Sequence, residues 1–101
     1  MRDKKGKILL NVTYKIQDRL RDEFIRQVLK ARIPEDTRLE AGNEKYSWSI
    51  PVDREDEVGL LEFWENEETQ KAHLNTENYK KLSELKEKYV LSVEIEKFIV
   101  E

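Results

Sequence analysis

The single histidine of this sequence, His73, is the side chain best suited to move a proton near neutral pH. It lies near the end of a helix that we expect to begin at Glu67. Its neighbours one turn earlier, Thr69 and Gln70, are uncharged, so any carboxylate that orients the imidazole has to come from another element. Two interpretations stay open: a general base that takes a proton from a phenol, or a structural histidine that interacts with the carbonyl end of its helix.

Glu62 and Trp64 lie two positions apart in a predicted strand and therefore share one of its faces. A buried carboxylate is unfavourable unless it is paired, so we expect Arg38 or a residue of the last strand to pair with Glu62, in preference to an acid–base role. Trp64 is either a core residue or a flat surface for an aromatic ligand.

Asn11 interrupts an otherwise apolar strand. An amide in a half-buried strand needs hydrogen-bond partners, which come from a pocket or from neighbouring protein groups. Asn11 is therefore a candidate polar contact for a ligand.

The composition argues against several other kinds of site. The chain has no cysteine, which removes thiol nucleophiles, thiolate metal ligands and disulfides, and one histidine is too few for the usual transition-metal site. The sequence contains no glycine-rich phosphate loop, nucleophile elbow, or flavin or nicotinamide fingerprint. We therefore predict no cofactor and no metal.

Charge and hydropathy restrict the partners and the location. Nineteen basic and 22 acidic residues interleave and give a net charge of −3, which does not favour nucleic acid or anionic lipid, so we predict neither partner. The sequence shows no apolar stretch long enough for a signal peptide or a membrane span. This pattern predicts a cytoplasmic location.

The elements that must position these side chains follow from two periodicities. Apolar residues alternate with polar ones in four segments that we predict to be strands: 7–16, 44–52, 57–65 and 90–100. Pro51 indicates that the second strand ends at an edge or outside the ladder. Apolar residues recur at helical spacing in three segments: 19–31, 67–74 and 77–88.

Local signals mark where the helices begin and end. We expect Asp18, Asn66 and Thr76 to cap the three helices. Pro34 suits the first turn of a short additional helix over residues 35–41, which Gly42 is placed to end. The order predicts one α+β domain over residues 1–101, with residues 1–6 frayed. It is a ferredoxin-like β-α-β-β-α-β fold with both long helices on one face of a four-stranded antiparallel sheet.

The predicted strands are apolar on both faces, which a sheet with one wet face does not require. Residues 58–64 read Val-Gly-Leu-Leu-Glu-Phe-Trp, and the last strand carries apolar residues at 90, 91, 93, 95 and 98–100. The helices can cover only one face, so the other would leave large apolar side chains in water. We expect a homodimer through the sheet face; the alternative is a monomer with scattered exposed hydrophobic residues.

Several segments carry a pattern in a recognisable order. They are Leu9–Tyr14, Thr37–Asn43 leading into Tyr46, Leu60–Glu68 with His73 nine residues after Trp64, and Thr76–Leu82. In this order the sequence resembles the antibiotic biosynthesis monooxygenase family of dimeric α/β-barrel proteins, from about residue 7 to residue 98.

This resemblance implies a protomer that dimerises through its sheet and holds a pocket between the sheet and the helices. Known members include cofactor-independent monooxygenases acting on phenols or quinols, heme-degrading enzymes, and an enzyme that processes a quorum-sensing sugar derivative. In the heme-degrading branch an asparagine at the position of Asn11 faces the ligand. However, that branch has its heme-ligating histidine where this chain has Ser83, and its pocket tryptophan aligns with His73. Small quinol-oxidising members often carry a histidine where this chain has Asn78.

The resemblance favours a cofactor-independent monooxygenase acting on a small quinol or polyphenol. Its implied catalytic residues are His73, Asn11 and Trp64. The residues implied to line the substrate pocket, each of which could instead be core, are Glu62, Tyr46, Trp48, Phe24 and Tyr79. Two alternatives remain: an isomerase or other proton-shuttling enzyme on a small metabolite, and a non-enzymatic dimer that binds a small apolar or aromatic ligand.

Overall fold

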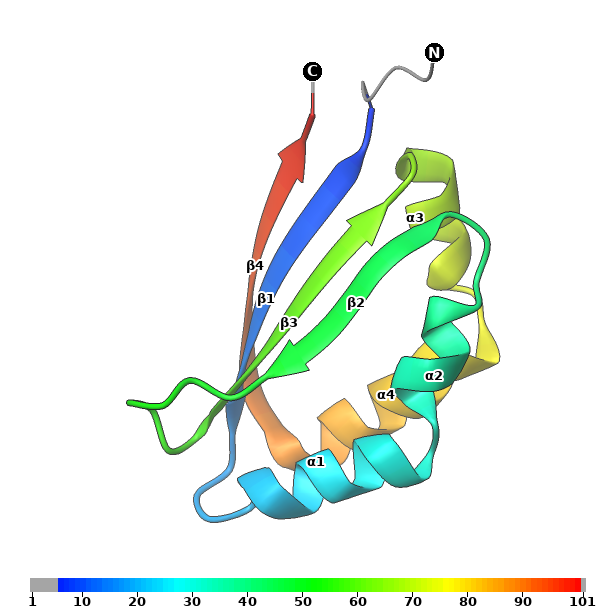
Figure 1. Cartoon of the computed structure of the whole chain (residues 1–101). Coiled ribbons are helices and arrows are strands. Elements are labelled where there is room, and N and C mark those ends of the chain that lie inside the picture. The colour runs from blue at the N-terminus through cyan, green and yellow to red at the C-terminus, as the bar shows by residue number, and fades with distance from the viewer. Residues whose placement is uncertain (1–5, 101) are drawn as a thin grey trace.

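The computed structural model describes residues 6–100 of the chain. Four strands and four helices occupy this range, and Figure 1 shows the helices gathered on one face of the sheet. Their bounds in chain order are β1 Ile8–Ile16, α1 Arg21–Lys30, α2 Ile33–Arg38, β2 Asn43–Ser49, β3 Glu57–Trp64, α3 Glu67–His73, α4 Glu77–Tyr89 and β4 Val90–Ile99. The predicted α+β arrangement is confirmed.

The four strands form one antiparallel sheet in the order β2-β3-β1-β4. The second predicted strand stops at Ser49, so Pro51 lies outside the ladder as expected. Strand β1 is central, and its register places Leu10 opposite Glu62 of β3 and opposite Lys97 of β4. Because directly paired residues point to the same side of a sheet, these three side chains share the helix-facing side.

The core lies between this side of the sheet and the helices. Every second residue of β1 is buried there: Ile8, Leu10, Val12, Tyr14 and Ile16. From the helices, Phe24 and Val28 of α1 and Leu82 and Tyr89 of α4 pack against them. The alternation predicted for β1 is therefore confirmed residue by residue.

Strand β4 is exposed along nearly its whole length, because the helices do not extend over it (Figure 1). Val93 and Ile95 pair with Tyr14 and Val12, so they lie on the helix-facing side, yet Ile95 is 63% exposed. The uncovered apolar surface is thus divided between the outer face of the sheet and the helix-facing side of β4.

Two of the three predicted helix caps are confirmed. The Asn66 side chain accepts a hydrogen bond from the Thr69 N–H in a reciprocal capping box, and the Thr76 hydroxyl accepts one from the Tyr79 N–H. The prediction for Asp18 is wrong. The chain turns before α1, with the Leu20 N–H bonded to the Gln17 carbonyl, and the helix begins after Leu20 without a side-chain cap.

The short helix also begins earlier than predicted. It covers Ile33–Arg38, with Pro34 in its first turn, and ends four residues before Gly42. Gly42 instead leads into β2 at a φ of +82°, and its carbonyl accepts the Glu65 N–H at 2.7 Å. A Cβ atom at this position would lie 2.5 Å from the Thr69 side chain, so glycine lets β2 and α3 approach closely.

Most of the segment predicted to be frayed, residues 1–6, lies outside the described residues. Gly6 is described, and its N–H donates to the Val100 carbonyl at 2.7 Å, so at this residue the chain is held to the other terminus. Over residues 6–100, every helix falls short of the length and apolar character that a membrane crossing requires. The cytoplasmic location stays a prediction.

Candidate functional site

A cavity of about 280 Å³ lies between the helix-facing side of β1, β3 and β4 and the helices α3 and α4. Its apolar wall consists of Leu10, Val12, Leu74, Val93 and Ile95. Its side chains that can carry charge or exchange a proton are Tyr14, Glu62, His73, Tyr79, Lys86 and Lys97. The cavity therefore combines an apolar wall with a small number of ionisable side chains. This combination is typical of sites that bind small molecules.

His73 is the best-positioned of these groups for proton transfer. It is the last residue of α3 and is only 4% exposed. Its Nδ1 atom lies 2.7 Å from the Oε1 atom of Glu40, which belongs to the turn after α2. The other oxygen of Glu40 accepts a hydrogen bond from the Asn78 amide at 2.9 Å. Glu40 is thus a carboxylate from another element that can orient the imidazole, and Nε2 is the ring nitrogen that this contact does not engage.

Aromatic rings surround the imidazole. The Trp64 ring lies 4.9 Å from it between centroids, and the Tyr79 and Tyr46 rings lie edge-on at 5.3 Å and 6.2 Å. Trp64 is fully buried, and its indole N–H donates to Glu62 Oε1 at 2.9 Å. Of these three rings, only that of Tyr79 lines the cavity. The Trp64 ring therefore contacts the imidazole from outside the cavity wall.

Glu62 is a carboxyl group in the cavity wall that is 7% exposed. Burial raises its pKa, while the Trp64 hydrogen bond and the nearby charges of His73 and Lys86 act in the opposite direction. The expected pairing with Arg38 is wrong, because the Arg38 guanidinium points to β2 and donates to the Tyr46 carbonyl at 3.0 Å. Trp64 supplies the hydrogen bond instead.

Asn11 does not converge with His73. It is exposed on the outer face of the sheet, where its amide donates to Glu96 Oε1 of β4 at 2.8 Å. The reason is the period of two in a strand: Leu10 and Val12 point into the cavity, so the residue between them points away. The expectation that Asn11 faces a pocket shared with His73 and Trp64 is therefore wrong.

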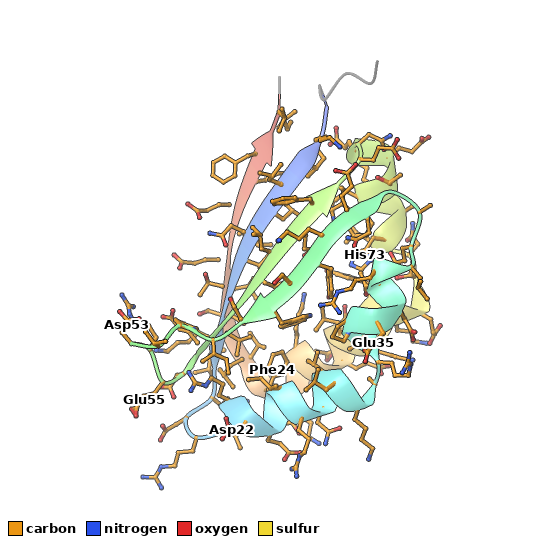
Figure 2. The ribbon with its side chains drawn as sticks, in the orientation of Figure 1. Asp22, Phe24, Glu35, Asp53, Glu55 and His73 are labelled. Carbon is orange, nitrogen blue, oxygen red and sulfur yellow. The ribbon has the colours of Figure 1, made fainter. Side chains whose placement is uncertain are left out.

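Phe24 and Trp48 belong to a second aromatic group around Tyr14. Trp48 stacks on Tyr14 with centroids 5.7 Å apart, and Phe24 meets both rings edge-on. Figure 2 shows Phe24 above α1, well apart from His73. Trp48 contributes to a different hollow of about 220 Å³ between α1 and β2, so neither residue lines the cavity at His73.

Tyr46 is a core residue between the two aromatic groups. It is buried under α2, with its hydroxyl beside the Thr37 hydroxyl and the Trp48 indole N–H. Burial raises its pKa, so it stays a neutral phenol near neutral pH. Tyr79, in contrast, lines the cavity beside His73, and its part in binding a substrate stays a prediction.

Sequence reasoning did not identify Glu40, which contacts His73, nor the ionisable cavity residues Tyr14, Lys86 and Lys97. Glu40 meets His73 across 33 positions of sequence, so no spacing rule could have joined them. Lys86 is one of many lysines on a helix rich in charge. Only its placement over the rings of Tyr14 and Tyr79 distinguishes it from the others.

Comparison with known proteins adds the family and the fold. The sequence model of the family described as "Antibiotic biosynthesis monooxygenase" matches residues 7–85. None of the curated proteins matches the chain.

Solved structures share the fold at low sequence identity. A Pseudomonas aeruginosa protein is 18% identical with a TM-score of 0.85, over 98% of both chains. A Bacteroides thetaiotaomicron protein of unknown function is 22% identical with a TM-score of 0.83, over 95% of this chain and 99% of that one. A Deinococcus radiodurans protein, provisionally named an antibiotic biosynthesis monooxygenase, is 20% identical with a TM-score of 0.78, over 90% and 89%.

Proposed function

The chain belongs to the antibiotic biosynthesis monooxygenase family, and from this premise we propose that it is a cofactor-independent monooxygenase of a small quinol or polyphenol. The observation that carries the proposal is the Glu40–His73 pair at the wall of a cavity with aromatic and aliphatic sides. A base of this kind suits a substrate that becomes reactive toward O₂ when it loses a proton.

The proposed reaction begins with proton transfer from a phenolic O–H to Nε2 of His73, while Glu40 holds the imidazole by Nδ1. The phenolate then supplies the electrons that reduce O₂. One oxygen atom enters the product, and the other leaves as water with hydrogens lost by the substrate. The protein contributes the base and the position of the substrate.

Trp64 acts in this proposal as a positioning residue. It contacts the back of the imidazole and holds the Glu62 carboxyl through its indole N–H. Its replacement by phenylalanine would keep the ring contact and remove the hydrogen bond, and so would separate these two contributions.

Oxygen consumption by the purified protein with a panel of quinols tests the proposal. We expect acceleration over buffer that falls by about two to four orders of magnitude in His73→Asn, the range that a general base contributes. Glu68→Gln, an exposed position of the same helix α3 and outside the cavity wall, serves as the control. No acceleration over buffer, or equal acceleration in His73→Asn, would contradict it.

A proton-shuttling isomerase is the second candidate, because Glu62 and His73 line the same cavity and burial raises the pKa of Glu62. Such an enzyme needs no O₂. Turnover of a small enolisable metabolite under strict anaerobic conditions would therefore favour it over the monooxygenase. The convergence of several ionisable groups on one cavity supports a catalytic site in preference to a purely apolar binding pocket.

We also propose that the protein is a homodimer through its sheet face. Phe63, Leu9 and Phe98 are cross-strand neighbours on β3, β1 and β4 and form an apolar row on the outer face. Phe98 is 53% exposed, and the helices of this chain lie on the opposite side (Figure 1). A second copy would remove this row from water.

A further inference from the structure

Lys86 is a cation at the cavity that the mechanism above leaves without a role. Its Nζ lies 5.2 Å from the centroid of the Tyr79 ring and 5.9 Å from that of Tyr14. The side chain is half-buried and lines the same cavity as His73. The two rings hold the ammonium group by cation–π attraction, which fixes its position at the cavity wall.

This ammonium group has no carboxylate within ion-pair distance among the described residues. Among residues 6–100 it makes neither an ion pair nor a hydrogen bond, whereas Lys97 at the same cavity is paired with Glu67 at 3.4 Å. The carboxyl group that shares the cavity, Glu62, accepts a hydrogen bond from the Trp64 indole N–H and makes no ion pair with Lys86, although the charge of Lys86 acts to lower its pKa. A partly desolvated cation without a partner favours an anion that arrives with a ligand.

Building on the proposed function, we propose that Lys86 binds the ionised oxygen of the ligand, so that the site selects aromatic weak acids and holds them as phenolates. The proton of the ligand O–H passes to Nε2 of His73, and its electron pair stays on the oxygen beside Nζ of Lys86. No electron is transferred in this step. Because the proton acceptor and the cation line one cavity, the anion forms inside the site, which suits a phenol better than a carboxylic acid that is already ionised in water.

Two non-reacting probes test this assignment on the full-length protein. 4-Nitrophenol changes its visible spectrum when it ionises, and 4-nitroanisole has nearly the same shape but carries no ionisable oxygen. With the wild-type protein we expect bound 4-nitrophenol to be more ionised than the free probe at the same pH. Lys86→Met, which keeps the length of the side chain and removes the charge, should weaken phenolate binding by about tenfold or more.

Three comparisons keep the test specific. Lys86→Arg, which keeps the charge, should retain phenolate binding. Lys80→Met removes an exposed lysine of the same helix and should leave binding unchanged. 4-Nitroanisole should bind the wild type and Lys86→Met within about twofold of each other, because burial of its ring and not charge determines its affinity.

The assignment is overturned if 4-nitrophenol binds only as the neutral phenol, if it does not bind the wild type at all, or if its ionisation is the same in Lys86→Met. The result is independent of O₂ chemistry. Normal quinol oxidation in Lys86→Met with unchanged probe ionisation would reject the role of Lys86 alone, whereas probe ionisation without any O₂ consumption would reject the monooxygenase alone.

Discussion

The Nδ1 atom of His73 and the Oε1 atom of Glu40 lie 2.7 Å apart, and this contact joins the end of α3 to the turn after α2. The pair has the form of a base held by a carboxylate, in which the carboxylate sets the tautomer and the direction of the ring. Asn78 holds the second oxygen of Glu40, so the carboxylate itself has little freedom to turn.

Replacing Glu40 by alanine should lower kcat for quinol oxidation by about tenfold to a hundredfold, a part of what the base itself contributes, with a smaller change in KM. The variant keeps the imidazole but loses the group that orients it. Steady-state O₂ consumption measures the effect, and Glu35→Ala, an exposed carboxylate of α2, is the matched control.

NMR of the His73 imidazole nitrogens tests the positioning role of Glu40 separately from any effect on stability. The chain has one histidine, so its imidazole nitrogens give one assignable set of signals. We expect a proton fixed on Nδ1 in the wild type and a mixture of tautomers in Glu40→Ala. Unchanged kcat together with an unchanged tautomer would contradict the positioning role.

Glu62 should make stability depend on pH. Its pKa is raised in the folded state, so as the pH rises the unfolded chain releases this proton at a lower pH than the folded chain does. The free energy of unfolding therefore falls as the pH rises above the ordinary pKa of 4.5. The fall ends once the pH passes the folded-state pKa. Between the two pKa values, the difference in unfolding free energy between wild type and Glu62→Gln should change by up to about 1.4 kcal/mol per pH unit.

Urea unfolding between pH 4 and pH 8 measures this difference. Glu87→Gln, an exposed carboxylate of α4, should run parallel to the wild type. A parallel curve for Glu62→Gln would mean that burial does not hold the proton on Glu62.

If the protein is a dimer through its sheet face, one charged substitution on that face should reduce its mass in solution to that of a monomer. Phe98→Glu places a charge in the apolar row of the outer face, next to Leu9, and should convert a dimer at low micromolar concentration into a monomer. Leu39→Glu, at an exposed position after α2, should leave the dimer intact. Sedimentation equilibrium decides the matter, and a wild type of monomer mass would remove the basis of the proposal.

Gly42→Ala should destabilise the fold more than Gly6→Ala. Both glycines have a positive φ, so each substitution carries a similar backbone cost of about 1 kcal/mol. Only at position 42 does the new Cβ meet a neighbour, the Thr69 side chain at 2.5 Å, which adds about 1–3 kcal/mol of overpacking. Urea unfolding of the two variants measures the difference. Equal decreases in the free energy of unfolding would show that α3 can move away from the new Cβ atom without destabilising the fold.

The elements predictable from the sequence are those whose signals are local. The alternation of β1 and the caps at Asn66 and Thr76 depend on neighbouring residues, and all of them are confirmed. The predicted cap at Asp18 failed because the backbone turn at residues 17–20, with Arg19 at a φ of +67°, delays the helix. Propensity at one residue does not reveal such a turn.

The site was predictable only in part. His73 was identifiable because it is the only histidine, but its partner Glu40 comes from a distant turn whose position depends on the packed fold. Asn11 shows the opposite case. The alternation of β1 already separated it from Leu10 and Val12, and the resemblance to ligand-facing asparagines in related proteins suggested a pocket role that this alternation does not allow.

The cavity is built from two unequal stretches of the chain. The acidic and imidazole side chains Glu40, Glu62 and His73 lie within the family match over residues 7–85, whereas Val93, Ile95 and Lys97 of β4 lie beyond it. Strand β4 thus supplies one side of the cavity wall, opposite the segments that carry His73 and Glu62. We expect exchange of the ten residues of β4 between related proteins to change ligand preference more than it changes the contact between His73 and Glu40.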